Sequence, residues 1–427
     1  MLTKRFTVLI LVLGLLLTGS LVTAQDVTLT ILTHWGEEIH AENQAKMYGY
    51  CADQTGVAYE LRTVPFNDLL TTIVTGRTAG TNPDIYHLYN LWLPDFTGES
   101  GLLSTPPQEL VDDIVANSPA GVVEGVTANG QVWGYPTEVN TYLLIWNKRL
   151  FEEAGYTAAP QTWDELKEIA AAITKVDDTG AITQAGYGVL TGWDSGVVHP
   201  WSAYLLSNGG SYMNEDATAT AFNSPEGLEA LQLYADLLEN GGMDMSVAGW
   251  DFPNGKVGMT VMANWWRATL IASEAVDYET EVGVAPVPVG PSGDTSMTLS
   301  YNWLWSVDAT SQQQEKAWEF VQCLNTNRDD GTGSPSGEFL VKSLGAIPSL
   351  IFDQEAYGED LGDFFLTAFV ESTNFAKPEP VVAGGQEVKT YLQAEIEAVL
   401  SGLTDAESAL MAAADSGDAV LSEMASQ

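Results

Sequence analysis

Residues 27–36 have the sequence VTLTILTHWG, in which β-branched and apolar residues alternate until the group His34-Trp35-Gly36. Such alternation followed by a glycine predicts a β-strand that runs into a loop. The chain that follows is compatible with a helix over residues 39–52, a strand over 57–64, a helix over 66–74 and a strand over 84–88. Strands and helices in this order predict a βαβ arrangement and therefore a parallel sheet.

A second α/β unit is predicted further along the chain. Thr162 and Glu165 have the spacing of a capping box that opens a helix over residues 163–174, and Ser224-Pro225 opens another helix. Further elements are expected as a strand over residues 142–146, a segment of helix breakers over 286–293, a strand over 303–307 and a helix over 311–324. The predicted fold class is therefore α/β, with two units whose connections cross more than once.

The composition excludes several functions. The 427 residues include 57 Asp and Glu against 16 Lys and Arg, a formal net charge of -41, and 45% are hydrophobic. The apolar fraction suffices for two or three folded domains. Because so many carboxylates repel phosphate backbones and anionic lipids, we expect no nucleic-acid or membrane-surface partner. We expect the charge to be spread over solvated faces.

The first residues have the pattern of a targeting segment. Lys4 and Arg5 precede an apolar run over residues 6–17, and Val22-Thr23-Ala24 supplies the small residues of a cleavage site. This pattern predicts a secretory signal peptide over residues 1–24. A membrane anchor is the weaker interpretation, because a span needs about 20 apolar residues. We therefore predict a protein that is secreted, either periplasmic or at the cell surface.

No motif in the sequence indicates catalysis, a metal site or a cofactor. HExxH, CxxC, GxxxxGK[ST] and GxSxG are all missing, and the four histidines are scattered. Residues 177–180 resemble half of a calcium loop but lack the later ligands, so a plain turn is the better interpretation. We accordingly predict no catalytic residue, no metal ligand and no cofactor.

Aromatic residues gather at strand ends and in loops, beside polar groups. They are Trp35, Trp193 in a loop expected over residues 192–200, the pair Trp265 and Trp266, and Trp303. Aromatic faces beside amide and carboxylate groups suit a carbohydrate, whose C–H faces pack on rings while its hydroxyls take fixed donors and acceptors. Since adjacent residues of an extended segment point to opposite faces, one of Trp265 and Trp266 is expected in the core.

These features occur within a longer series of motifs. The series is His34-Trp35-Gly36, Thr55-Gly56-Val57, Val64-Pro65-Phe66, residues 80–84 (GTNPD), Gly134-Tyr135-Pro136, Trp146-Asn147-Lys148, residues 150–155 (LFEEAG), residues 160–166 (PQTWDEL), Asn208-Gly209-Gly210, residues 222–226 (FNSPE) and residues 255–259 (GKVGM). In this order the chain resembles the family 1 extracellular solute-binding proteins of ABC importers, the maltose-binding-protein-like group. The scarcity of Lys and Arg is not a requirement of that family.

The resemblance implies a two-lobe fold of the type II periplasmic-binding-protein kind, with a ligand cleft between the lobes. It implies that residues 25–139 and 287–343 form lobe one and that residues 140–286 and 344–427 form lobe two. It further implies a monomer that closes around a sugar and is recognised by a membrane permease. The ligand-binding positions carried over are Trp35, Glu37, Asn67, Tyr89, Asn140, Trp193, Trp265, Arg267, Asn302 and Trp303.

Two other functions remain open at this level. A polyamine or other cationic solute would also suit the acidic charge and the aromatic side chains. A secreted glycan-cleaving enzyme would need two carboxylates at about 5 to 9 Å around one glycosidic bond.

The two cysteines also allow two interpretations. The family layout places Cys51 and Cys323 in one lobe, so either a disulfide or two separately buried thiols is expected.

Overall fold

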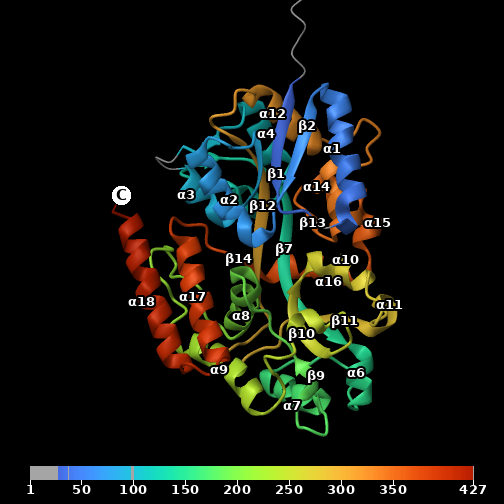
Figure 1. Cartoon of the computed structure of the whole chain (residues 1–427), viewed down its shortest axis with the longest axis vertical. Helices are drawn as coiled ribbons and strands as arrows, with labels where there is room; N and C mark the ends of the chain where they lie inside the picture. The colour runs from blue at the N-terminus through green and yellow to red at the C-terminus, as the bar shows by residue number, and fades with distance from the viewer. Residues whose placement is uncertain (1–26, 37, 98–100, 427) are drawn as a thin grey trace, which may run out of the picture.

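Two lobes are stacked along the long axis of the molecule in the computed structural model (Figure 1). The structure describes residues 27–36, 38–97 and 101–426. The predicted signal peptide over residues 1–24 and the predicted ligand residue Glu37 lie outside the described residues. The first lobe carries the N-terminal strands, and the second lobe carries the last helices of the chain.

A parallel three-stranded core begins the first lobe, as the opening βαβ pattern predicts. Its strands are β1 (Thr28–Thr33), β2 (Ala58–Thr63) and β3 (Ile85–Tyr89), joined through α1 (Ala41–Thr55) and α2 (Phe66–Ala79). β1 lies between β2 and β3 and is parallel to both. Gly56 and Gly80 end the two helices with φ of 67° and 68°, a conformation that glycine adopts without strain.

Two long antiparallel strands connect the lobes. They are β7 (Tyr135–Asn147) and β12 (Thr298–Asp308), and both run along the middle of the molecule (Figure 1). Residues 135–141 of β7 pair with β12, whereas Tyr142–Trp146 pair with β10 (Val257–Ala263) of the second lobe. One sheet therefore continues through both lobes, in the order β2-β1-β3-β12-β7-β10 and then β9 (Ile182–Tyr187) and β8 (Lys175–Val176).

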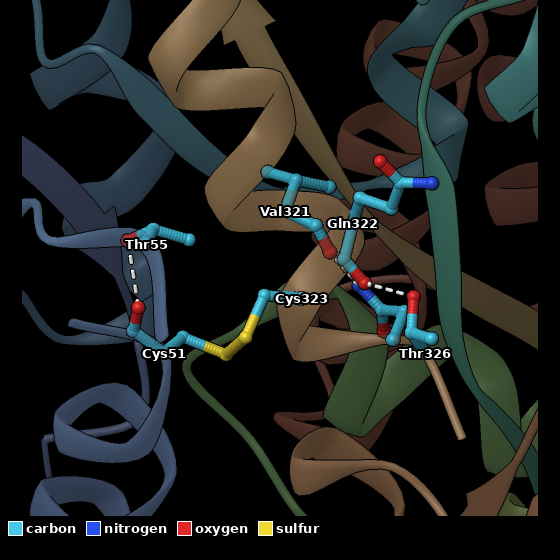
Figure 2. Close-up of a disulfide and its surroundings, with 7 residues drawn as sticks. Cys51, Thr55, Val321, Gln322, Cys323 and Thr326 are labelled. Carbon is cyan, nitrogen blue, oxygen red and sulfur yellow. Dashed lines mark hydrogen bonds between the residues drawn. A yellow bond between two sulfur atoms is a disulfide. The ribbon is translucent and has the colours of Figure 1, made fainter. Parts of the chain in front are cut away.

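A disulfide joins two helices of the first lobe. Cys51 near the end of α1 is bonded to Cys323 near the end of α12 (Gln314–Leu324), with the Cα atoms 5.7 Å apart. Figure 2 shows the sulfur atoms bridging the two helices, with Thr55 donating to the Cys51 carbonyl group. The bridge is thus the correct one of the two predicted alternatives. The lobe also contains α4 (Gln108–Asn117), α13 (Pro335–Phe339), α14 (Ile351–Ala356) and α15 (Gly358–Leu361).

The second lobe surrounds the other end of the sheet with helices. Thr162 caps the predicted helix, accepting from the backbone N–H of Glu165, and Ser224 caps another by accepting from that of Gly227. The strands are β8 (Lys175–Val176), β9 (Ile182–Tyr187) and β11 (Val282–Ala285), and the helices are α6 (Lys148–Glu153), α7 (Trp163–Ile173), α8 (Asp194–Ser207), α9 (Pro225–Glu239), α10 (Arg267–Ile271), α11 (Tyr278–Glu281), α16 (Phe364–Ser372), α17 (Gly385–Leu400) and α18 (Ala406–Met424). Residues 177–180 form the predicted turn, in which Asp177 accepts from the backbone of Thr179 and Ala181.

One predicted loop is wrong. Residues 194–200 belong to α8, which is buried on every side and contains Pro200. A helix that is buried on every side has no amphipathic period, and an internal proline usually breaks a helix, so neither signal predicted a helix here.

The contacts of the chain differ from the predicted lobe ranges in two places. Residues 288–297 hydrogen-bond to the second lobe, as Ser292 N–H does to Asn208 Oδ1 at 2.9 Å, and β12 then carries the chain to the first lobe. Residues 347–357 stay with the first lobe, where buried Asp353 accepts from the backbone and the side chain of Ser334. The lobe ranges otherwise stay a prediction.

Candidate functional site

A cavity of about 690 Å³ lies where the two lobes meet. Its walls come from the loop after β1, the first turn of α2, the end of β3, both crossing strands, and the segments around Trp193, Trp250 and Trp265 in the second lobe. These are the ends of strands and the loops that follow them, which is where α/β sheets bind ligands. A cavity of this size accommodates a small molecule of a few rings.

Aromatic rings line the cavity on both sides. In the first lobe the ring of Trp303 stacks on that of His34, with centroids 4.0 Å apart. In the second lobe Trp193 stacks on Trp250 at 6.2 Å. Phe66 reaches across, and its ring centroid lies 5.6 Å from that of Trp193, so the two lobes are in contact at this point.

Local backbone features hold the aromatic rings in place. Trp193 stands just before α8, and its indole packs over Gly196, where an added Cβ would lie 2.0 Å from the indole nitrogen. Only glycine fits beneath that ring. Trp265 donates from Nε1 to the Tyr301 hydroxyl at 3.0 Å, a bond that ties a second-lobe ring to a crossing strand.

Several buried polar atoms on the cavity residues have no hydrogen-bond partner among the described residues. They are His34 Nδ1, Trp35 Nε1, Trp193 Nε1 and Asn140 Oδ1. A buried donor or acceptor that stays unpaired costs roughly 1 to 3 kcal/mol, so such atoms are rare in folded proteins. Donors and acceptors among aromatic faces fit a ligand that carries hydroxyl groups on a partly apolar skeleton.

The structure brings most of the predicted ligand residues together. The cavity is lined by Trp35, Asn67, Tyr89, Asn140, Trp193, Trp265 and Trp303. Their contact with a ligand stays a prediction. Trp266 is fully buried in the core, while Trp265 lines the cavity, so the predicted division between these two neighbours is confirmed.

Two predicted residues do not line the cavity. Arg267 donates to the Tyr278 hydroxyl at 3.1 Å and lies 3.4 Å from Asp363 Oδ1, which makes it part of an ion pair within the second lobe. Asn302 donates to the backbone carbonyl of Glu138 at 3.3 Å, and it is not among the residues that line the cavity. The predicted ligand residue Glu37 lies outside the described residues.

Many lining residues were not predicted as ligand contacts, and among them are three aromatic residues and one glutamate. Phe66, Trp250 and Tyr301 add three rings, and Glu138 adds a carboxyl group. Tyr301 and Trp250 carry part of the signal of the predicted aromatics, since each stands beside a polar residue, Asn302 and Asp251 respectively. Glu138 has a different signal, a charged residue inside the mainly apolar strand β7, but the predicted strand began only at Tyr142.

Glu138 is the one carboxylate among the described lining residues. Its side chain accepts from the Thr137 hydroxyl and lies 3.7 Å from His87 Nε2. Burial raises the pKa of Glu138 to about 8 and lowers the pKa of His87 well below its ordinary value. Both groups are therefore predominantly neutral at pH 7 in this environment.

A second buried carboxylate lies next to the cavity, with a different set of partners. Glu379 lies 3.1 Å from the ammonium of Lys389 and 3.0 Å from His199 Nε2, and it accepts from the Tyr89 hydroxyl. Lys389 also donates to Tyr89 at 2.8 Å and to Ser195 at 2.9 Å. Because Tyr89 and Ser195 line the cavity from different lobes, this cluster holds the two walls together.

The described residues contain no group of three or more His, Cys, Asp or Glu side chains arranged to hold a metal ion. No helix within the described residues has both the length and the apolar character that are needed to cross a bilayer.

A cleft of this kind between two α/β lobes defines a class of proteins that enclose a solute between their lobes. The family model of bacterial extracellular solute-binding proteins matches residues 35–330, more than half of the chain. The protein therefore belongs to the bacterial extracellular solute-binding proteins, and the resemblance found in the sequence is confirmed.

Individual relatives agree with this assignment. A putative binding protein of Brucella abortus is 26% identical over 378 residues, which cover 87% of each chain. A cyclic alpha-maltosyl-1,6-maltose binding protein from Arthrobacter globiformis is 27% identical, with a TM-score of 0.72 over 93% of this chain and 100% of that chain. The GacH receptor of Streptomyces glaucescens is 21% identical, with a TM-score of 0.80 over 93% of this chain and 99% of that chain. The predicted two-lobe fold is confirmed.

Proposed function

We propose that the protein is a sugar or oligosaccharide receptor that delivers its ligand to the permease of an ABC importer. The observation that carries the proposal is the cavity between the lobes, walled by aromatic rings from both sides and containing buried polar atoms without partners. Rings pack against the C–H faces of sugars, and unpaired donors and acceptors serve their hydroxyls. The Arthrobacter relative, whose name gives cyclic alpha-maltosyl-1,6-maltose as its ligand, supports the same class of ligand.

The mechanism follows from the distribution of the walls. A ligand that touches both lobes binds the closed arrangement more tightly than an open one, and it shifts the population toward closure by that difference in affinity. The permease then recognises the closed form. The two crossing strands, β7 and β12, are the segments about which the lobes would move.

The proposal includes export and binding without turnover. The predicted signal peptide and the family both support a location at the cell surface or in the periplasm. A glycan-cleaving enzyme needs two facing carboxylates. The described lining offers Glu138 alone, which favours a receptor over a hydrolase.

A thermal-shift screen tests this function, because a ligand that binds only the folded state raises the melting temperature. The probes are maltotriose, cyclic alpha-maltosyl-1,6-maltose and N,N′-diacetylchitobiose, each followed for release of smaller products. We expect a saturable rise with at least one probe and no product. No shift with any sugar, or product that accumulates with time, would contradict the proposal.

A matched pair of variants ties the shift to the cavity. Trp250 lines the cavity and is 43% exposed, while Tyr391 on α17 is 41% exposed and lies away from it. Trp250→Ala should reduce the affinity for the sugar by about 1 to 3 kcal/mol, the usual cost of losing an aromatic contact. Tyr391→Ala should leave the affinity unchanged.

A further inference from the structure

Glu138 stands at an irregularity of the crossing strand β7. The register between β12 and β7 shifts between Asn302 and Leu304, so that Thr137 and Glu138 together face Trp303 alone. An extra residue of this kind bends the strand and changes the direction of its side chains, and such bulges are frequent beside binding sites. Here it accompanies a carboxyl group in the cavity wall, although the residue is only 1% exposed.

The carboxyl group has no cationic partner among the described residues. Its nearest basic group is the imidazole of His87, which burial keeps neutral. Neither lysine nor arginine occurs in the described lining of the cavity. Buried carboxylates are normally paired, so this one lacks the partner that its charged form requires.

Neighbouring groups complete a site for a cation. Asn140 lies two residues further along β7, is 2% exposed, and has a side-chain oxygen without a partner. The rings of Tyr301 and Trp303 belong to the adjacent strand β12 and also line the cavity. Two acceptors beside electron-rich rings are the groups that bind an ammonium ion in proteins.

Resting on the proposed function, we infer that the cavity takes an oligosaccharide bearing a basic amine, and that the Glu138 carboxylate pairs with its ammonium group. The net charge of -41 adds to this preference, since it attracts cationic solutes and repels anionic ones. Below pH 8 the carboxyl group loses its proton as the ammonium binds, and that proton is released to the solvent.

The pH dependence depends on which groups surround Glu138. His34 and His87 have pKa values lowered well below the ordinary value by burial, and burial raises the pKa of Tyr301, so none of them titrates between pH 6 and 9. β13 (Ile347–Pro348), which also pairs with β7, carries no titratable side chain. His40, which hydrogen-bonds to Ser343 at 3.0 Å, also lines the cavity. Because Glu138→Gln retains His40, any pH dependence of binding that comes from His40 persists in this variant and can be subtracted.

The experiment compares maltotriose with a derivative in which one hydroxyl is replaced by a primary amine, and N,N′-diacetylchitobiose with its deacetylated form. Binding is measured by calorimetry on the full chain at pH 6, 7 and 8. We expect the better amine probe to bind at least about tenfold tighter than its neutral partner at pH 8, as a charge-assisted hydrogen bond provides. Its affinity should rise with pH over this range.

Glu138→Gln should lower the ratio of amine to neutral affinity by about 10- to 100-fold and abolish the rise with pH. Glu215→Gln removes one charge from an exposed position of the second lobe and should change neither quantity. If neutral sugars bind as tightly as the amines, or the ratio survives in Glu138→Gln, the inference is wrong while the proposed function stands. If none of the four sugars binds, both are wrong.

Discussion

Glu138 and Glu379 are both buried beside the same cavity, with exposures of 1% and 5%, yet their surroundings differ. Glu379 has Lys389 at 3.1 Å and the Tyr89 hydroxyl as a donor. Glu138 has a threonine hydroxyl and a neutral imidazole. The difference separates a carboxylate whose partner belongs to the fold from one whose partner would arrive with the ligand.

The largest expected effect comes from removing the partner of Glu379. Lys389→Met should lower the free energy of unfolding by about 3 to 5 kcal/mol, because it leaves a buried carboxylate without its cation. Urea denaturation at pH 7 measures this change. Lys316→Met breaks an exposed pair with Glu319 and should have almost no effect. Equal effects of the two variants would mean that Glu379 is not held by a buried charge pair.

The second prediction concerns Glu138, whose pKa is raised by burial from 4.5 to about 8. Between these values the folded protein keeps a proton that the unfolded chain has lost, so this residue makes stability fall as the pH rises from about 4.5 to 8. Glutamine does not titrate. At pH 8 Glu138→Gln should therefore be more stable than the original protein by about 2 to 4 kcal/mol.

Denaturation curves at pH 5 and pH 8 measure this second effect. The difference in stability between Glu138→Gln and the original protein should grow between the two pH values. Glu215→Gln serves as the control, and its difference from the original protein should stay constant. A constant difference for Glu138→Gln would show that Glu138 is charged at neutral pH and already paired.

The smallest effect is expected for a single hydrogen bond of the paired carboxylate. Tyr89→Phe removes one donor to Glu379 but leaves Lys389 in place. It should lower the free energy of unfolding by about 1 kcal/mol, the typical net value of one hydrogen bond. The exposed variant Tyr391→Phe is the control in the same denaturation assay. A loss as large as that of Lys389→Met would mean that the tyrosine, and not the lysine, stabilises Glu379.

The sequence alone predicts the regular part of this fold. The alternation after Val27 and the caps at Thr162 and Ser224 are local signals, and each element that they predict is present. Helix α8 was missed because a helix buried on all sides lacks the amphipathic period of apolar residues, and because Pro200 is a residue that usually ends a helix. Local signals fail where tertiary packing decides the conformation.

The candidate site was predicted in its aromatic part and missed in its charged part. Tryptophans at strand ends are visible in a single sequence, and four of them line the cavity as expected. Lys389 and Glu379 are distant in sequence from Tyr89, at 300 and 290 positions, so no spacing rule connects them. With 57 acidic residues in the chain, neither Glu138 nor Glu379 stands out until burial is known.

The Cys51–Cys323 bridge closes a covalent ring that contains most of the second lobe, because the two cysteines are 272 positions apart. A protease that cuts an exposed turn inside this ring, such as the one at Asn214–Ala219, leaves both products joined. Nicked molecules would therefore migrate as one species in a non-reducing gel and separate only after reduction. A single backbone cut between the cysteines therefore does not release either lobe.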